Sequence, residues 1–243
     1  MKETIYTIPV MEALENPGAC PFCAMHAALE QNAINFLMGP SVAYMEDDVR
    51  MATNDTGFCG AHYQKLYETR NRLGLVLMLH THFMEINRRL ERLYHDPPKK
   101  KNLPKYLGEV NKACYVCDMI EKSYTRYLDT FFQLFAKEEA VREKLRQSKG
   151  VCLPHLSEAI SYAPKKLGGA NLELFYETLY TVQRAQMAKI EADLDWFVKK
   201  FDYRYHDEPW KDSKDAAERA IERLASVKPI PRPVAAKGGD ADE

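Results

Sequence analysis

The chain has 243 residues, 46% of them hydrophobic, and a formal net charge of −1. This length and composition suit one large globular domain or two small ones with a buried core. The near-neutral charge argues against a protein that holds nucleic acid through its phosphates, because such proteins usually carry a basic excess. The longest apolar run, Leu73 to Leu79, is too short to span a bilayer, and the start lacks the apolar segment of a signal peptide. We therefore expect a cytoplasmic protein without a membrane segment.

The first part of the chain has the pattern of successive helices. A turn at 16–18 leads to Cys20, and good helix formers then continue to about Leu37, after which Gly39 and Pro40 end the helix. A polar stretch leads to a second helix start at Cys59. A long amphipathic helix follows, with an apolar stripe made of Leu75, Leu79, Phe83, Ile86, Leu90 and Leu93.

The segment 97–105 contains three prolines and a run of lysines, a composition that disfavours regular structure. We place a domain boundary there, between a first repeat, 1–96, and a second repeat, 106–199. The lysines have no aromatic residues among them, so they are typical of a solvated linker rather than of a nucleic-acid site.

The second repeat has the same helical character as the first. Two apolar stripes are predicted, the first made of Ile120, Tyr124, Tyr127, Phe131 and Leu134, and the second of Leu172, Phe175, Leu179, Val182, Ile190, Leu194 and Phe197. Gln186 interrupts the second stripe and is expected at its edge. No strand-like alternation of useful length occurs. We predict an all-α fold in which two similar metal-stapled helical lobes pack through their long helices.

An extension, 200–227, follows the repeats and has no equivalent in the first one. Its last helix is predicted to start at Asp212 or Ser213, with an inward face formed by Ala217, Ala220, Ile221 and Leu224. The residues 228–243 are rich in Pro, Ala, Gly and Asp, a composition typical of a disordered tail.

A repeated motif contains all six cysteines of the chain. A CxxC is followed by a CxxH after 35 residues in the first repeat and after 34 in the second. Three cysteines and one histidine form the ligand set of a closed tetrahedral zinc site. The sequence therefore predicts two zinc ions, and the predicted ligands are Cys20, Cys23, Cys59 and His62 in the first repeat and Cys114, Cys117, Cys152 and His155 in the second.

The spacing within each motif suits a metal. Two ligands three residues apart at a helix start direct their side chains to one point, and the helix dipole favours the thiolate that binds zinc. We expect the CxxC and CxxH of one repeat to share an ion, which would tie a helical hairpin. An iron–sulfur cluster is the main alternative, because histidine is also a cluster ligand. A redox dithiol and a chance spacing are the others, and the dithiol leaves the CxxH unexplained.

The segment from Lys200 to Trp210 combines charged and aromatic side chains. One interpretation is an aromatic latch that seals the last helix against the second lobe. The other is a recognition patch of Asp202, Tyr203, Arg204 and Trp210, in which the arginine binds a carboxylate or phosphate between aromatic walls.

With the motifs CPFC, GFCGAH, CYVC and GVCLPH, followed by Lys200-Phe201-Asp202-Tyr203-Arg204, the chain resembles an uncharacterised bacterial family. That family, a domain of unknown function, has repeated CPxC and GxCxxH motifs and a KxDYR segment. The resemblance covers most of 10–225, and Tyr115 stands where the family more often has proline. It implies a cytoplasmic bacterial protein and supplies no catalytic residues.

These observations favour a non-enzymatic helical protein, held by two structural zinc ions, that binds a protein or small-molecule partner. Four protein ligands for each ion leave no open position for a substrate. Two alternatives remain: a metal-dependent or iron–sulfur redox enzyme or electron carrier, and a thiol-based metal or redox sensor.

Overall fold

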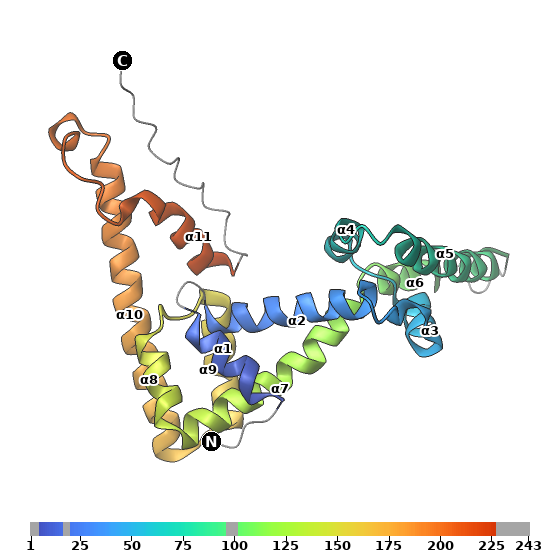
Figure 1. The fold of residues 1–243 in the computed structure, drawn as a ribbon, viewed down its shortest axis with the longest axis horizontal. Coiled ribbons are helices and arrows are strands. Elements are labelled where there is room, and N and C mark those ends of the chain that lie inside the picture. Colours follow the sequence, from blue (N-terminus) through green and yellow to red (C-terminus); the bar gives the residue numbers. More distant parts are fainter. Residues whose placement is uncertain (1–4, 17–19, 96–101, 227–243) are drawn as a thin grey trace. The chain divides into compact units, whose positions relative to one another are not determined.

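The computed structural model describes residues 5–16, 20–95 and 102–226. Within them no strand occurs, so the predicted all-α class is confirmed (Figure 1). From the start of the chain to α7, the elements are α1 Thr7–Glu15, α2 Pro21–Met38, η1 Ala43–Met45, α3 Asp47–Thr56, α4 Gly60–Glu68, α5 Arg72–His95, α6 Leu103–Val110 and α7 Tyr115–Lys137. The remaining elements are α8 Glu139–Gln147, α9 Leu153–Tyr162, η3 Ala163–Lys165, α10 Gly169–Lys199, η4 Tyr203–Tyr205, η5 Ser213–Asp215 and α11 Ala216–Ala225. None of the described helices has the length and apolar character needed to cross a membrane.

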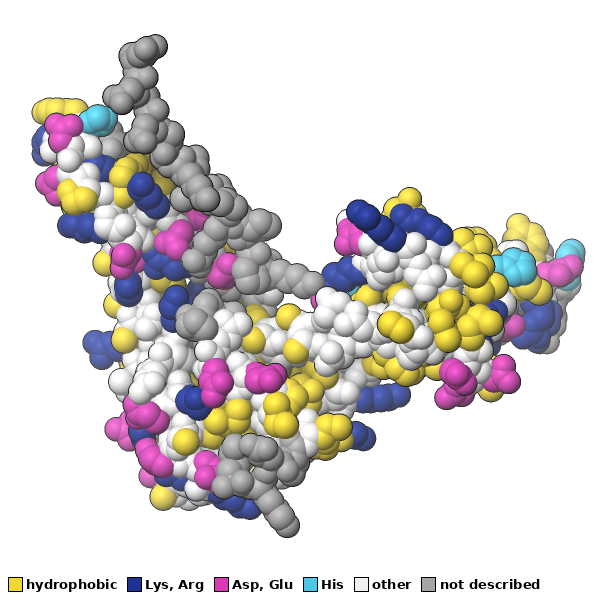
Figure 2. All heavy atoms as spheres, in the orientation of Figure 1, with side chains coloured by type: hydrophobic (Ala, Val, Ile, Leu, Met, Phe, Trp, Pro, Cys, Tyr) yellow, Lys and Arg dark blue, Asp and Glu magenta, His cyan; other side chains and the backbone are white. Residues whose placement is uncertain are grey.

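The chain forms two compact units that do not coincide with the two predicted repeats. Unit 1 comprises Met1–Met25 and Arg126–Glu243, and unit 2 comprises His26–Thr125. The division falls inside α2 and inside α7, because each of these long helices begins at a CxxC motif in one unit and ends in the other. Basic and acidic side chains are interspersed over the face of each unit drawn in Figure 2, in keeping with the net charge of −1.

Unit 2 is built around α5, against which α3, α4, α6 and η1 pack. Its core contains Leu37, Leu66, Met78 and Val116, each at most 1% exposed. The predicted stripe on α5 is wrong at one position, because Phe83 is 60% exposed. The neighbouring His82 is buried instead, with its Nδ1 2.7 Å from the backbone oxygen of Asn54, so a hydrogen bond compensates for burying the imidazole.

The core of unit 1 is rich in aromatic rings. The ring of Phe175 on α10 lies 5.1 Å from that of Phe132 and 5.2 Å from that of Phe135, both on α7, in edge-to-face arrangements. Phe22, in the first turn of α2, meets Phe131 in the same way at 5.2 Å. These contacts confirm the inward faces predicted for α7 and α10, and they hold the start of α2 beside α7.

The final helix differs from its prediction. Of the four residues expected to face inward, Ala220 is half-buried, but Ala217, Ile221 and Leu224 are exposed, the last two by 44% and 55%. Ala216 and Arg223 are buried instead. The physical reason is an ion-pair network, since Arg219 bonds to Asp193 of α10 at 2.9 Å and thereby sets which side of α11 meets α10. The predicted linker lies partly outside the described residues, and of its described part Leu103–Lys105 already belong to α6. The predicted tail, 228–243, also lies outside the described residues.

Candidate metal centres

The eight predicted ligands come together in two groups, each within one unit. Site 1, in unit 1, consists of Cys20, Cys23, Cys152 and His155. Site 2, in unit 2, consists of Cys59, His62, Cys114 and Cys117. In each site the four ligand atoms lie within 4.8 Å of one another, so both groups can hold a metal ion.

The predicted pairing of the motifs is wrong. Site 1 combines the first CxxC with the second CxxH, and site 2 combines the first CxxH with the second CxxC. The sequence analysis instead expected the CxxC and the CxxH of the same predicted repeat to bind one ion. The exchange is possible because any CxxC and any CxxH present the same local geometry, and the long helices that leave the CxxC motifs decide which partner is near.

Helix starts position all four pairs of ligands. Cys20, Cys59, Cys114 and Cys152 each directly precede a helix, and the carbonyl of each accepts the hydrogen bond of the residue four positions on, at 2.8–3.0 Å. The second ligand of each motif lies three residues later, in the first turn of that helix, on the same side. Two helix N-termini thus meet at each site, and their dipoles favour negative sulfur there.

The geometry of site 1 fits one tetrahedral ion. Zinc bonds of about 2.3 Å to sulfur and about 2.0 Å to nitrogen set edges of about 3.8 Å between sulfurs and about 3.5 Å between sulfur and nitrogen. The Sγ of Cys152 lies 3.6 Å from that of Cys23 and 3.8 Å from that of Cys20. His155 Nδ1 lies 3.0–3.6 Å from the three sulfurs. These separations are close to the edges that zinc requires.

Site 2 has a similar geometry and a carboxylate behind its histidine. His62 Nδ1 lies 3.2 Å from the sulfurs of Cys59 and Cys114 and 3.4 Å from that of Cys117. On the other side of the ring, His62 Nε2 lies 3.2 Å from Glu30 Oε1, which also accepts a hydrogen bond from Lys65. Metal-binding histidines usually donate their second nitrogen to such a carboxylate, which fixes the tautomer and the ring orientation.

Electrostatics distinguish the cysteines of each site. At site 1, hydrogen bonds with the Cys20 and Cys23 sulfurs hold the pKa of Cys152 far below its ordinary value, whereas burial raises the pKa of Cys20. At site 2, burial raises the pKa of Cys59, but hydrogen bonds from the His62 backbone N–H and from cysteine thiols outweigh it, and the pKa falls. In each site a CxxH cysteine thus has a lowered pKa and a CxxC cysteine, Cys20 or Cys117, a raised one.

Burial lowers the pKa of His155, but hydrogen bonds with Cys152 and Cys23 outweigh this effect and raise the pKa to about 10. Burial and the Cys114 thiol raise the pKa of Cys117 to about 12. A cation that binds these ligands must displace their protons, so metal binding at either site is coupled to proton release.

Residues that sequence analysis did not single out surround the sites. Ser226, just after α11, places its Oγ 3.3 Å from Cys23 Sγ and 3.4 Å from His155 Nδ1, so the C-terminal helix covers site 1. Site 2 is more open, since Cys117 is exposed. Glu30 of site 2 comes from α2, the helix that begins at site 1, and no spacing in the sequence connects it with His62.

A glycine with positive φ precedes each CxxH motif. Gly57 has φ 60° and Gly150 has φ 75°, conformations that residues with a Cβ adopt only under strain. Each glycine also lies against a buried polar side chain. A Cβ at Gly57 would stand 2.4 Å from His82 Nε2, and one at Gly150 would stand 2.9 Å from Gln183 Oε1. These glycines let the chain turn sharply into the ligand cysteine.

The predicted recognition patch lies at the end of α10. The Arg204 guanidinium bonds to the Asp202 carboxylate at 2.6 Å, and the Trp210 ring stacks at a tilt on Phe197, 5.5 Å away. Tyr203 is 87% exposed. The organising residue is Lys200, which is buried and donates hydrogen bonds to the backbone oxygens of Tyr205 and His206 at 2.6 Å each and to that of Glu208 at 2.5 Å.

Over residues 1–230, the sequence matches a family of unknown function, DUF6062. No curated protein and no solved structure matches the chain.

Proposed function

The chain belongs to this family of unknown function, and we propose that it is a zinc-binding helical protein whose two Cys3His sites are structural and whose surface binds a ligand or partner. The observation that supports the proposal is the short distance between the ligand atoms within each site. Sulfur and nitrogen separations of 3.0–3.8 Å at site 1 correspond to the edges of one tetrahedron around one zinc ion.

The same observation weighs against an iron–sulfur cluster. Ligands on different irons of a cluster stand farther apart than ligands on one ion, because the cluster lies between them. Ligand atoms that all lie within 4.8 Å of one another leave little room for it. Four protein ligands also complete the coordination of zinc, which is the arrangement of structural rather than catalytic sites. None of the six cysteines, all of which the structure describes, forms a disulfide, and cysteines without disulfides suit a cytoplasmic protein.

Elemental analysis of protein purified without oxygen tests the proposal. We expect two zinc ions for each chain, a colourless solution and little iron. A brown solution with visible absorption and stoichiometric iron would show that the sites hold an iron–sulfur cluster instead of zinc. Less than one ion for each chain, with six thiols that titrate freely in the native protein, would show that the two sites do not bind metal.

Chelation tests whether the ions are structural. Each ion joins a long helix, α2 or α7, to a short one, α9 or α4, that would be unstable alone, so removing zinc with a strong chelator should lower both helicity and melting temperature. Readdition of zinc should restore both. A protein that loses both ions and keeps its helicity and melting temperature would show that the sites do not hold the fold.

A further inference from the structure

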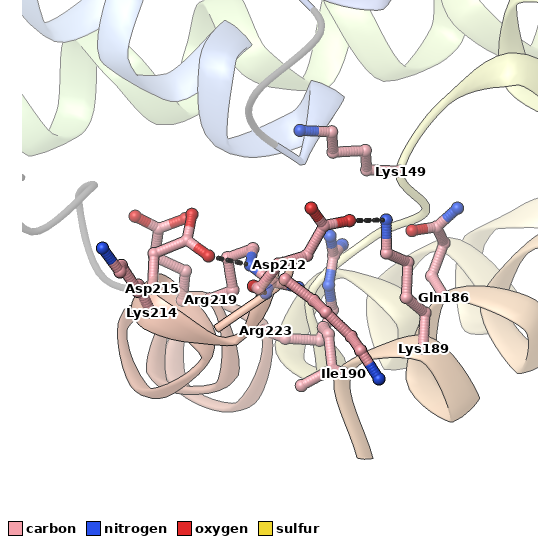
Figure 3. Close-up of a pocket in the computed structure, with 11 residues that line it drawn as sticks. Lys149, Gln186, Lys189, Ile190, Asp212, Lys214, Asp215, Arg219 and Arg223 are labelled. Atoms are coloured by element: carbon pink, nitrogen blue, oxygen red, sulfur yellow. Dashed lines mark hydrogen bonds and ion pairs between the residues drawn. The ribbon is translucent and has the colours of Figure 1, made fainter. Parts of the chain in front are cut away.

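A basic cavity lies between α10 and α11 in unit 1, and neither metal site uses it. It has a volume of about 370 Å³, within the range of small-molecule pockets. Residues of α10 line one side, and α11 with the turn before it lines the other (Figure 3). Its lining has six basic side chains, Lys149, Lys189, Lys211, Lys214, Arg219 and Arg223, and three acidic ones, Asp212, Asp215 and Glu222. The balance is therefore three positive charges.

Part of this charge is neutralised inside the lining. Lys189 donates to Asp212 at 3.1 Å, and Arg219 bonds to Asp215 at 2.8 Å, as the dashed lines of Figure 3 show. Lys211 lies over the ring of Trp196, 3.7 Å from its centroid. Neither Lys149 nor Lys214 has an ion-pair partner among the described residues, and both are exposed and free to turn toward an anion.

Arg223 is the unusual member of the lining. Its side chain belongs to the core rather than the surface, with the residue only 9% exposed. Its Nε and Nη1 are buried, and in the part of the chain that the structure describes they have no hydrogen-bond partner. Burial lowers the pKa of Arg223, but a guanidinium stays charged at any ordinary pH. A buried charged donor without an acceptor is unfavourable, so an acceptor is expected to arrive with a ligand.

The charge of site 1 accounts for only part of this arrangement. Three thiolates, one imidazole and one zinc ion carry a net charge of −1, and the negative sulfurs of Cys20 and Cys152 attract the Arg223 guanidinium. This attraction explains why a positive charge is tolerated there. It does not supply an acceptor for Nε and Nη1, which have none among the described residues. An anion in the cavity would supply one.

We propose that this cavity binds a small phosphate ester, with the Arg223 side chain turning into the cavity so that its fork donates to the phosphate, and with Lys149 and Lys214 closing over it. A forked guanidinium matches two phosphate oxygens, and because the cavity remains positive after Arg219 is also paired with Asp193, its charge suits a dianion better than a single carboxylate. Glu222 Oε1, also buried and without a partner in the described residues, accepts a hydroxyl of the ester. The inference rests on the proposed function in one respect, that the chain is a ligand-binding protein.

Calorimetric titration of the full-length, zinc-loaded protein tests the inference. The probes are ribose 5-phosphate, inorganic phosphate and ribose, in about 0.15 M salt so that unspecific attraction is screened. We expect ribose 5-phosphate to bind, inorganic phosphate to bind more weakly and ribose not to bind. Arg223→Met, which keeps the apolar stem, should weaken ribose 5-phosphate binding at least tenfold. The double variant Lys149→Met/Lys214→Met should weaken it too, without changing the zinc content.

Arg184→Met is the matched control. Arg184 is an exposed arginine of α10 outside the cavity lining, so its loss changes the net charge equally and should leave ribose 5-phosphate affinity unchanged. Equal weakening by this control, unchanged affinity in Arg223→Met, or no binding of either phosphate would overturn the inference. Equal affinity for both phosphates would support the anion site and overturn the role of Glu222.

Zinc content is measured in the same samples. Two retained zinc ions without phosphate binding would overturn this inference alone, and phosphate binding by protein without zinc would overturn only the proposed metal.

Discussion

The exchanged pairing of the metal motifs can be tested with four double variants that each remove one CxxC cysteine and one CxxH cysteine. Two variants remove both residues from one site, Cys23→Ala/Cys152→Ala from site 1 and Cys59→Ala/Cys117→Ala from site 2. The other two, Cys23→Ala/Cys59→Ala and Cys117→Ala/Cys152→Ala, remove one residue from each site. All four lose the same number of thiols, so they control for one another.

The structure predicts different numbers of complete sites. A same-site variant keeps one site with all four ligands and leaves two ligands at the other. A cross-site variant leaves three ligands at each. Structural zinc is held by about 10–16 kcal/mol, or about 2.5–4 kcal/mol for each of four ligands, so one lost ligand weakens affinity about 10²- to 10³-fold.

The assay measures zinc content after dialysis against a chelator. This chelator should bind zinc more weakly than a complete four-ligand site does, but more tightly than a site that has lost a ligand. Same-site variants should retain one ion, and cross-site variants should retain none. Circular dichroism of each dialysed sample reports whether the fold survives. The opposite result, one ion in both cross-site variants and none in the same-site variants, would mean that each repeat holds its own ion and that the structure pairs the motifs wrongly.

Three further predictions concern stability. Gly57→Ala should lower the free energy of unfolding by about 2–3 kcal/mol in chemical denaturation, because the alanine would need a left-handed backbone and its Cβ would clash with His82. Gly60→Ala is the control, since a Cβ there meets nothing within 4 Å, and it should be neutral or slightly stabilising. Asp129→Asn should destabilise by about 1 kcal/mol at neutral pH, because hydrogen bonds from Lys166 and Tyr162 outweigh burial and lower the carboxyl pKa. A lowered pKa stabilises above the unfolded value of about 4, so the difference between wild type and variant should shrink as pH falls below it, and a constant difference would contradict the argument. Lys200→Met should destabilise by about 2–4 kcal/mol, since it leaves three backbone oxygens without their donor, while Lys199→Met should leave melting unchanged.

Local features of this fold could be predicted from the sequence because they depend on neighbouring residues. The period of Tyr127, Phe131 and Leu134 marks a helix face that burial then confirms. The three-residue spacing inside each metal motif likewise identified ligands that do converge, because that spacing is already fixed by the first turn of a helix.

The errors involve interactions between distant segments. The apolar pattern of α11 predicted an inward Ile221 and Leu224, but Asp193 lies far away in sequence and its ion pair with Arg219 turns the helix. Arg223 was missed for the same reason. A charged residue on a short amphipathic helix is normally solvated, and Arg223 is buried because α11 packs against α10 and α9. Motif pairing failed because nothing in a CxxC specifies its CxxH.

The exchanged pairing also explains why the compact units differ from the predicted repeats. In chain order, site 1 uses the first and the last of the four motifs, and site 2 uses the two motifs between them. The segment that site 2 closes, 62–114, therefore lies inside the segment that site 1 closes, 23–152. Unit 2 is accordingly one continuous segment, His26–Thr125, whereas unit 1 is assembled from both ends of the chain. Closing the longer loop costs about 0.8 kcal/mol more chain entropy than closing the shorter one, by the logarithmic dependence on loop length. This difference is small beside the free energy of zinc binding, so the ions can hold long connections that a small helical core would support poorly. A cut at the predicted linker would leave each half with one CxxC and one CxxH that belong to different sites, and neither half would keep a complete ligand set.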